Sequence, residues 1–229
     1  MTIAIMQPYF FPYIGYWQLI KAVDVFVIYD DVNYINKGYV NRNNILVNGQ
    51  KQLFTLELIG ASQNKLINEI EVGHNQNKLI KTVSMSYKKA PYFSEIFPII
   101  ESILICDEKK LSKYLGNSLK IIAEYLNIKT TFIYSSDIVK DNALKGQEKI
   151  IDIAKQLKTG VYINSIGGQE LYDRKVFAKN NLKLHFLNSK IQEYKQFNND
   201  FIPNLSVIDL MMFAKDDDIQ EILNKYTLI

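Results

Sequence analysis

Residues that bind ligands or move protons gather where the predicted strands end. The strand-like residues 1–6 are followed by Gln7, Tyr9, Tyr13 and Tyr16, and Pro8 and Pro12 exclude a helix over 7–13. A tyrosine offers an aromatic face and a hydroxyl, so this loop is typical of a ring-lined pocket for a sugar or a base. The alternative is that these rings form a small, tightly packed core.

Two carboxylates and a basic segment follow the second predicted strand, 25–29. Asp30 and Asp31 are candidate proton acceptors. The next segment contains Lys37, Asn41, Arg42 and Asn43. Arg42 is one of only two arginines in a lysine-rich chain, which favours a role that needs its planar fork, such as bidentate binding of a phosphate. Lys37 would add a point charge, and the two asparagines would orient a sugar or an amide. A solvated loop that enters a hairpin is the alternative.

Two further candidates come from the last third of the chain. Gly167 and Gly168 follow a strand and precede Tyr172, so backbone N–H groups there are accessible to a ligand, unless the glycines only form a tight turn. His185 lies in the last predicted strand of the sheet, 182–187, and is expected near its carboxyl end. It is a candidate general base, or else a histidine of the core.

The elements that position these residues alternate in an α/β order. Strands are predicted at 1–6, 25–29, 130–134, 161–163 and 182–187, with helices at 14–22, 146–157 and 169–179. We expect a parallel sheet of about five strands with helices on both faces. A β-hairpin insertion over about 39–58 turns at Asn48-Gly49, a helical subdomain covers about 75–127, and the C-terminal helices are 206–213 and 219–226. Residues 1–229 are expected to form a single α/β domain.

The carboxyl ends of parallel strands meet at one edge of a sheet, so the ligand cleft is expected where 7–16, 30–43 and 165–169 converge. Within the acidic pair, alternation of side chains predicts that Asp30 faces the ligand and Asp31 is structural. At the later helix 206–213, Ser206 and Asp209 are expected to form a capping box.

The composition excludes several classes of protein. The chain has 229 residues, of which 48% are hydrophobic and 22% charged, so it is not intrinsically disordered. One cysteine and two histidines exclude a disulfide framework and most metal centres, so no metal is expected, and no cofactor is indicated. Cys106 is expected to be an inert thiol. A net charge of +3 does not indicate a dedicated nucleic-acid binder. Without a signal peptide or a long apolar segment, a soluble cytoplasmic protein with no membrane insertion is expected.

The segment Tyr13-Ile14-Gly15-Tyr16 stands where class I nucleotide-binding folds have a His-x-Gly-His signature. This position predicts a Rossmann-like, nucleotidyltransferase-like core. Tyrosine does not supply the imidazolium that stabilises a transferring phosphoryl group, so the same motif disfavours nucleotidyl transfer.

Five segments in order along the chain resemble the WbqC-like protein family: 5–20, 29–32, 37–43, 162–172 and 205–209. Tyr39 departs from the tryptophan expected in relatives. The resemblance implies a bacterial protein of surface-polysaccharide, O-antigen or lipopolysaccharide biosynthesis. It further implies a transferase that moves glycine or another amino-acyl group onto the amine of a nucleotide-linked amino sugar.

The candidate residues are compatible with that reaction. Asp30, Asp31 or His185 would accept the amine proton, and Lys37 or the glycine-loop N–H groups would stabilise the oxyanion. Arg42 would bind the diphosphate. The acyl donor is left open between a carrier-protein thioester, an amino acid activated by ATP and an aminoacyl-tRNA. Two other classes also stay open: a nucleotidyl- or other group-transfer enzyme on the same fold, and a non-catalytic sugar-nucleotide-binding protein.

Overall fold

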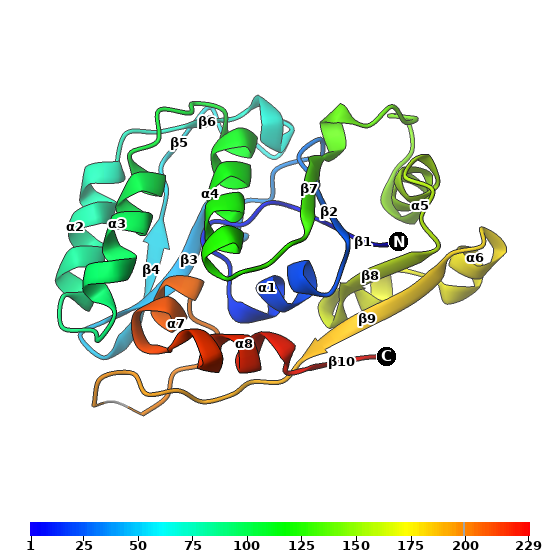
Figure 1. The fold of residues 1–229 in the computed structure, drawn as a ribbon. Helices are drawn as coiled ribbons and strands as arrows, with labels where there is room; N and C mark the ends of the chain where they lie inside the picture. Colours follow the sequence, from blue (N-terminus) through cyan, green and yellow to red (C-terminus); the bar gives the residue numbers. More distant parts are fainter. Residues whose placement is uncertain (199) are drawn as a thin grey trace.

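A six-stranded sheet forms the centre of the computed structural model, which describes every residue except 199 (Figure 1). The strand order is β10-β9-β8-β1-β2-β7, and only β10 runs antiparallel to its neighbour. The bounds are β1 Thr2–Met6, β2 Val25–Ile28, β7 Thr131–Tyr134, β8 Val161–Ser165, β9 Lys183–Ser189 and β10 Tyr226–Leu228. The predicted Rossmann-like α/β fold is therefore confirmed, with five parallel strands and one antiparallel edge strand.

Helices cover both faces of this sheet. Helix α1, Ile14–Lys21, connects β1 to β2 and packs on one face together with α8, Asp216–Asn224. Helices α5, Gly146–Gln156, and α6, Arg174–Lys179, cover the other face, where Ile150 and Phe177 belong to a second apolar cluster. Both neighbours of β1 are parallel to it, but the chain leaves it toward β2 and returns much later as β8. The order therefore reverses between β1 and β8, where ligands bind in open parallel sheets.

A hairpin leaves the sheet after β2. Its strands are β3, Arg42–Val47, and β4, Gln50–Thr55, which lie within the predicted insertion 39–58. Asn48 and Gly49 have φ of 49° and 73°, the positive values that a type I′ turn requires. The small sheet of β5, Leu58–Ile59, and β6, Glu71–Val72, follows with the short 3₁₀ helix η1, Ile67–Glu69, between its strands.

Three helices form the middle of the chain: α2 Gln76–Tyr87, α3 Phe93–Leu104 and α4 Leu111–Tyr125. Their buried residues, such as Val83, Ile100 and Leu119, are in the same apolar cluster as Phe26 of β2. The helical segment is thus packed onto the α1 face of the sheet, and the core runs from the sheet into the helices without a break.

The C-terminal third differs from expectation in two places. The predicted helix 169–179 is divided into a 3₁₀ helix η3, Ile166–Leu171, and the later α6, because Asp173 caps a new helix start through the backbone N–H of Lys175. The predicted helix 219–226 begins earlier, as α8, and ends at Asn224. The chain then forms β10, since Tyr226 and Thr227 are strand-favouring residues that pair with the free edge of β9. Helix α7, Val207–Phe213, lies close to its predicted position.

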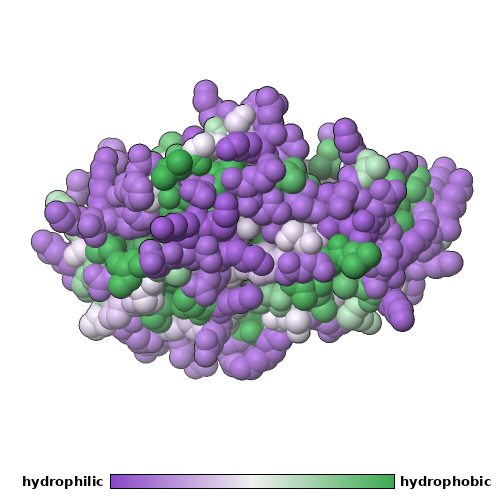
Figure 2. Space-filling view, turned by 90° about the horizontal axis from the view of Figure 1, so that it is seen from above, coloured by the Kyte–Doolittle hydropathy of each residue, from purple (hydrophilic) through white to green (hydrophobic). Residues whose placement is uncertain are grey.

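The fold buries most of its apolar residues in one large and one smaller cluster, and its surface is correspondingly hydrophilic. Figure 2 shows hydrophilic residues over most of the face seen from above, with hydrophobic residues in separate small groups. Among the described residues, no helix combines the length and the apolar character needed to cross a bilayer.

Candidate functional site

The three segments expected to form the cleft do come together. They follow β1, β2 and β8, which are adjacent in the sheet. The backbone N–H of Phe10 donates to the carbonyl of Tyr39 at 3.1 Å, which joins the first segment to the second. The Ser165 side chain lies close enough to the Tyr13 hydroxyl to lower its pKa, which places the third segment beside the first. The predicted convergence is therefore observed, and ligand binding there remains a prediction.

Three tyrosines stand at this junction, and we call Tyr9, Tyr13 and Tyr39 the tyrosine cluster. The ring centroids of Tyr9 and Tyr39 are 5.9 Å apart, and Tyr9 also stacks on Tyr16 at 5.2 Å. Tyr16 is buried and donates to the Gln7 carbonyl at 2.8 Å, so it is a fixed ring on which Tyr9 stacks. Tyr39 is 46% exposed, whereas Tyr9 and Tyr13 are partly buried.

The hydroxyls of Tyr9 and Tyr13 carry no charge near neutral pH. Burial raises the pKa of Tyr9 and of Tyr13 above the ordinary value of 10, and the neighbouring phenols raise both pKa values further. Each hydroxyl therefore keeps its proton and can donate a hydrogen bond as well as accept one. The cluster suits a neutral, hydroxyl-bearing group with a flat apolar face.

The start of α1 fixes the position of Tyr13. Tyr13 is the extended residue before the helix, and its carbonyl accepts from the backbone N–H of Tyr16 at 3.0 Å. A Cβ on Gly15 would lie 2.8 Å from the Tyr13 ring and 3.3 Å from Cβ of Ser189. Only glycine lets that ring lie against the helix, which explains the glycine of the Tyr-Ile-Gly-Tyr motif.

Residues 165–168, which we call the glycine segment, begin at the end of β8 and form the side of this junction opposite the segment after β2. Ser165 caps η3 by accepting from the backbone N–H of Gly167 at 3.3 Å. A Cβ on Gly168 would lie 2.6 Å from the amide nitrogen of Asn164, so this glycine permits a close approach. Tyr172 packs against Tyr162 in the apolar cluster on the α5 and α6 side, whereas Tyr9 and Tyr13 pack on the α1 side. Tyr172 is thus separated from the tyrosine cluster by the sheet.

The expectation that Asp30 faces the ligand is wrong. Asp30 is 1% exposed and accepts from the backbone N–H and the hydroxyl of Ser136, at 3.0 and 2.8 Å. Ser136 lies in the turn η2, Ser135–Asp137, directly after the neighbouring strand β7. The donors of that turn lie next to Asp30, so both carboxylate oxygens are engaged in linking the end of β2 to the end of β7. Burial raises the pKa of Asp30, and the Ser136 donors oppose that rise.

Asp31 has the structural role expected of it, with partners that sequence reasoning missed. It forms ion pairs with Lys140 at 2.8 Å and with Lys149 of α5 at 3.1 Å, and both ammonium groups are buried. Burial alone would raise the pKa of Asp31, but hydrogen bonds from Lys140 and Lys149 lower it on balance. The burial of Lys149 had a signal in the sequence, because this charged residue stands beside isoleucines on the apolar face of its helix.

The basic segment holds its own loop together instead of standing free as an anion clamp. The Arg42 guanidinium donates to the carbonyl of Gly38 at 3.0 Å and to the carbonyl of Lys37. Asn43 is buried and donates to the Phe11 carbonyl at 2.7 Å. Asn41 accepts from the Tyr34 hydroxyl and donates to the Leu56 carbonyl, both at 2.8 Å. These contacts position the loop that carries Tyr39, and of the four candidates Lys37, Asn41, Arg42 and Asn43 only Lys37 is exposed.

His185 does not lie at the carboxyl end of its strand. β9 extends to Ser189, and His185 pairs with Ile163, two positions before the pair of Ser165 and Leu187. Its side chain lines a shallow depression beside Arg174 of α6 instead of the tyrosine cluster. The prediction placed it nearer the edge because the strand was expected to stop at Leu187.

Sequence reasoning also missed a buried carboxylate on α7. Ser206 caps this helix as expected, by accepting from the backbone N–H of Ile208. Asp209 does not complete the capping box, because its side chain accepts from Tyr87 at 3.0 Å, Tyr194 at 2.8 Å and Gln196 at 2.6 Å. The partners come from two other parts of the chain, the end of α2 and the irregular segment that contains Tyr194 and Gln196, so no local motif predicts them. Burial raises the pKa of Asp209, and its three donors oppose that rise.

Comparison with known proteins places the chain in a family. No solved structure matches it. The uncharacterized protein Rv1507c of Mycobacterium tuberculosis is 27% identical over 214 residues, which cover 91% of this chain and 92% of that protein. The WbqC-like protein family matches residues 7–221, a range that includes the tyrosine cluster, the acidic pair, the glycine segment and Asp209. The chain therefore belongs to the WbqC-like protein family.

Proposed function

We propose that this protein is a transferase of surface-polysaccharide, O-antigen biosynthesis that binds a nucleotide-linked amino sugar at the tyrosine cluster. It transfers glycine or another amino-acyl group to the amine of that sugar. The observation that carries the proposal is the convergence of three tyrosine side chains where the order of the parallel strands reverses. Membership of the WbqC-like protein family supports the class of pathway.

The chemistry of the cluster suits a sugar. Pyranose rings have apolar C–H faces, which pack on aromatic rings, and hydroxyls, which exchange hydrogen bonds with phenols and with Ser165. Because Tyr9 and Tyr13 stay protonated, they can also donate to an oxygen that becomes negative during reaction.

The proposed step forms one amide bond. The sugar amine attacks the acyl carbon, the carbonyl oxygen becomes an oxyanion, and the bond to the leaving group then breaks. The amine proton leaves with that group or with water. No covalent acyl-enzyme is involved. In this proposal Asp30 and Asp31 support the loop after β2, since their oxygens are bonded to Ser136 and to the two buried lysines.

Binding tests the proposal first. Calorimetric titration with a panel of nucleotide-linked amino sugars should show at least one ligand whose affinity falls about tenfold in Tyr13→Phe, the scale of one lost hydrogen bond. Tyr125→Phe is the matched control, because Tyr125 lies on α4 and its hydroxyl contacts only Glu95 among the described residues. Equal affinity of Tyr13→Phe and the native protein for every sugar bound would remove Tyr13 from the site.

A turnover assay then distinguishes the three possible functions: amino-acyl transfer, nucleotidyl transfer and sugar-nucleotide binding without catalysis. Mass spectrometry of the sugar after incubation with a carrier-protein thioester, with amino acid plus ATP or with aminoacyl-tRNA should detect the added amino-acyl mass with one donor. Release of pyrophosphate with no amide product would favour the nucleotidyl-transfer alternative, which Tyr13 and Tyr16 disfavour. Binding without turnover by any donor would favour the sugar-nucleotide-binding protein.

A further inference from the structure

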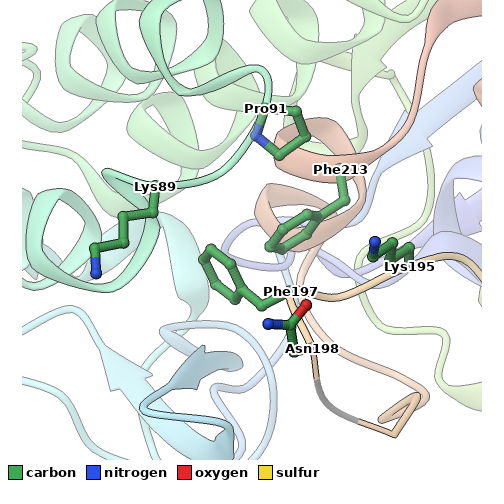
Figure 3. Close-up of a pocket in the computed structure, with 6 residues that line it drawn as sticks. All are labelled: Lys89, Pro91, Lys195, Phe197, Asn198 and Phe213. Carbon is green, nitrogen blue, oxygen red and sulfur yellow. The ribbon is translucent and has the colours of Figure 1, made fainter.

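A concave site lies at the far end of α7, away from the tyrosine cluster. It has a volume of about 460 Å³ and lies between the turn after α2, the last residue of α7 and the segment 195–198. Figure 3 shows its lining residues: Lys89, Pro91, Lys195, Phe197, Asn198 and Phe213. The volume is in the range of small-molecule sites.

The segment that carries three of these residues is firmly held. The Gln196 side chain accepts from the backbone N–H of Ile202 at 2.7 Å and donates to the Ile202 carbonyl at 3.2 Å and to Asp209 at 2.6 Å. The next residue, Phe197, has φ of 51°, an uncommon value for a bulky side chain. The buried Asp209 therefore anchors a loop that presents Lys195 and Phe197 in a fixed arrangement.

The lining combines an aromatic wall with positive charge. The rings of Phe197 and Phe213 meet edge to face, with centroids 4.6 Å apart and planes at 84°, and Phe213 in turn packs on Tyr87. Among the described lining residues two are lysines and none is acidic. A flat ring can rest on the phenylalanines, the Asn198 amide can bond its polar edge, and the Lys195 ammonium group attracts an anion.

We propose that this depression binds a phosphorylated planar ligand of mononucleotide size, with its ring against Phe197 and Phe213 and its phosphate toward Lys195. Lys89 lies on the opposite side of the two rings, with its ammonium group directed away from them (Figure 3). The site is separate from the tyrosine cluster. α7 starts after Ser206, which bridges to Tyr13, and ends at Phe213, so its seven residues separate the two sites by about 10 Å. The proposal does not depend on the transferase function.

The probes are AMP, GMP, CMP and UMP, each titrated at low salt, with the matching nucleosides and inorganic phosphate for comparison. At least one mononucleotide should bind about tenfold more tightly than its nucleoside and than phosphate. Lys195→Glu should weaken that binding at least tenfold, and Phe197→Leu should weaken it severalfold. Lys175→Glu on α6 is the control for the charge change, because Lys175 is also an exposed lysine.

Amide shifts in ¹⁵N-labelled protein locate the bound probe. Perturbation centred on 195–198 and on Phe213 is the expected result. Three results would each overturn the proposal: no mononucleotide bound below about 1 mM, phosphate bound as tightly as every mononucleotide, or perturbation centred on Tyr9 and Tyr13. Tyr13→Phe should leave mononucleotide binding unchanged, so failure of this site and failure of the proposed function are distinguishable.

Discussion

Asp30 and Asp31 are adjacent residues whose carboxylates meet opposite surroundings. Asp30 accepts only neutral donors, and burial raises its pKa. Asp31 lies between two buried ammonium groups, and its pKa is lowered on balance. The stability from Asp31 is therefore fully present above the pKa of the unfolded chain, near 4, and is lost as pH falls through the lower folded value.

Asp31→Asn should lower the free energy of unfolding at pH 7 by about 3–5 kcal/mol, because Lys140 and Lys149 remain buried without a counter-charge. The loss relative to the native protein should begin to shrink as pH falls below the unfolded pKa near 4, and should be gone once the pH has passed the lower pKa of folded Asp31. Urea unfolding at several pH values measures both effects.

Asp30→Asn should cost less than Asp31→Asn at pH 7. The folded state favours the protonated form of Asp30, so its contribution to stability is present below the unfolded pKa and is lost as pH rises through the raised folded value. An amide resembles that protonated form. Asp107→Asn, at an exposed position, is the control. A larger loss in Asp30→Asn than in Asp31→Asn would reverse this assignment.

At the scale of elements, one side chain of α7 holds the loop of the second candidate site. One oxygen of Asp209 accepts from Tyr87 and the other accepts from Tyr194 and Gln196. In Asp209→Asn an NH₂ group would replace one acceptor and face donors. We expect the free energy of unfolding to fall by about 3 kcal/mol, the order of two lost hydrogen bonds to a charged group.

The same substitution should release the loop that Gln196 holds. Hydrogen exchange at the backbone N–H of Ile202, which donates to Gln196, should accelerate more than exchange in β1. Asp218→Asn in the first turn of α8 is the control and should cost less than about 1 kcal/mol. Unchanged exchange at Ile202 would show that Asp209 does not hold this loop.

Local patterns predicted the elements that depend on neighbouring residues. Apolar runs located the five parallel strands, and Asn48-Gly49 located the hairpin turn, because these signals arise within a few residues. The loop tyrosines were found because they directly follow β1. The partners of Asp30, Asp31 and Asp209 were missed because each lies about 100 residues or more away or in a loop with no pattern. Strand β10 was missed for the same reason, since its partner is the edge of β9.

At the scale of the whole molecule, one buried amide joins the first helix to the last. Gln18 of α1 is fully buried, and its Nε2 donates to the carbonyls of Ile222 at 2.8 Å and Lys225 at 3.1 Å. These carbonyls end α8 and lead directly into β10. The contact therefore sets where the C-terminal strand meets the sheet edge, more than 200 residues from Gln18.

Gln18→Leu keeps the approximate shape of the side chain but removes this donor from two carbonyls. The free energy of unfolding should fall by about 1 kcal/mol, the order of one net hydrogen bond, because each carbonyl keeps a backbone donor: the Lys225 N–H for Ile222 and the Lys190 N–H for Lys225. The substitution should also act locally. Backbone amides of β10 should exchange hydrogen faster, because α8 no longer fixes the start of that strand. Amides of β1 should keep their protection relative to global unfolding. Gln156→Leu, at an exposed position on α5, should change stability by less than about 0.5 kcal/mol. If β10 and β1 lose protection in equal proportion in Gln18→Leu, the amide contributes to general stability and does not specifically position the C-terminal strand.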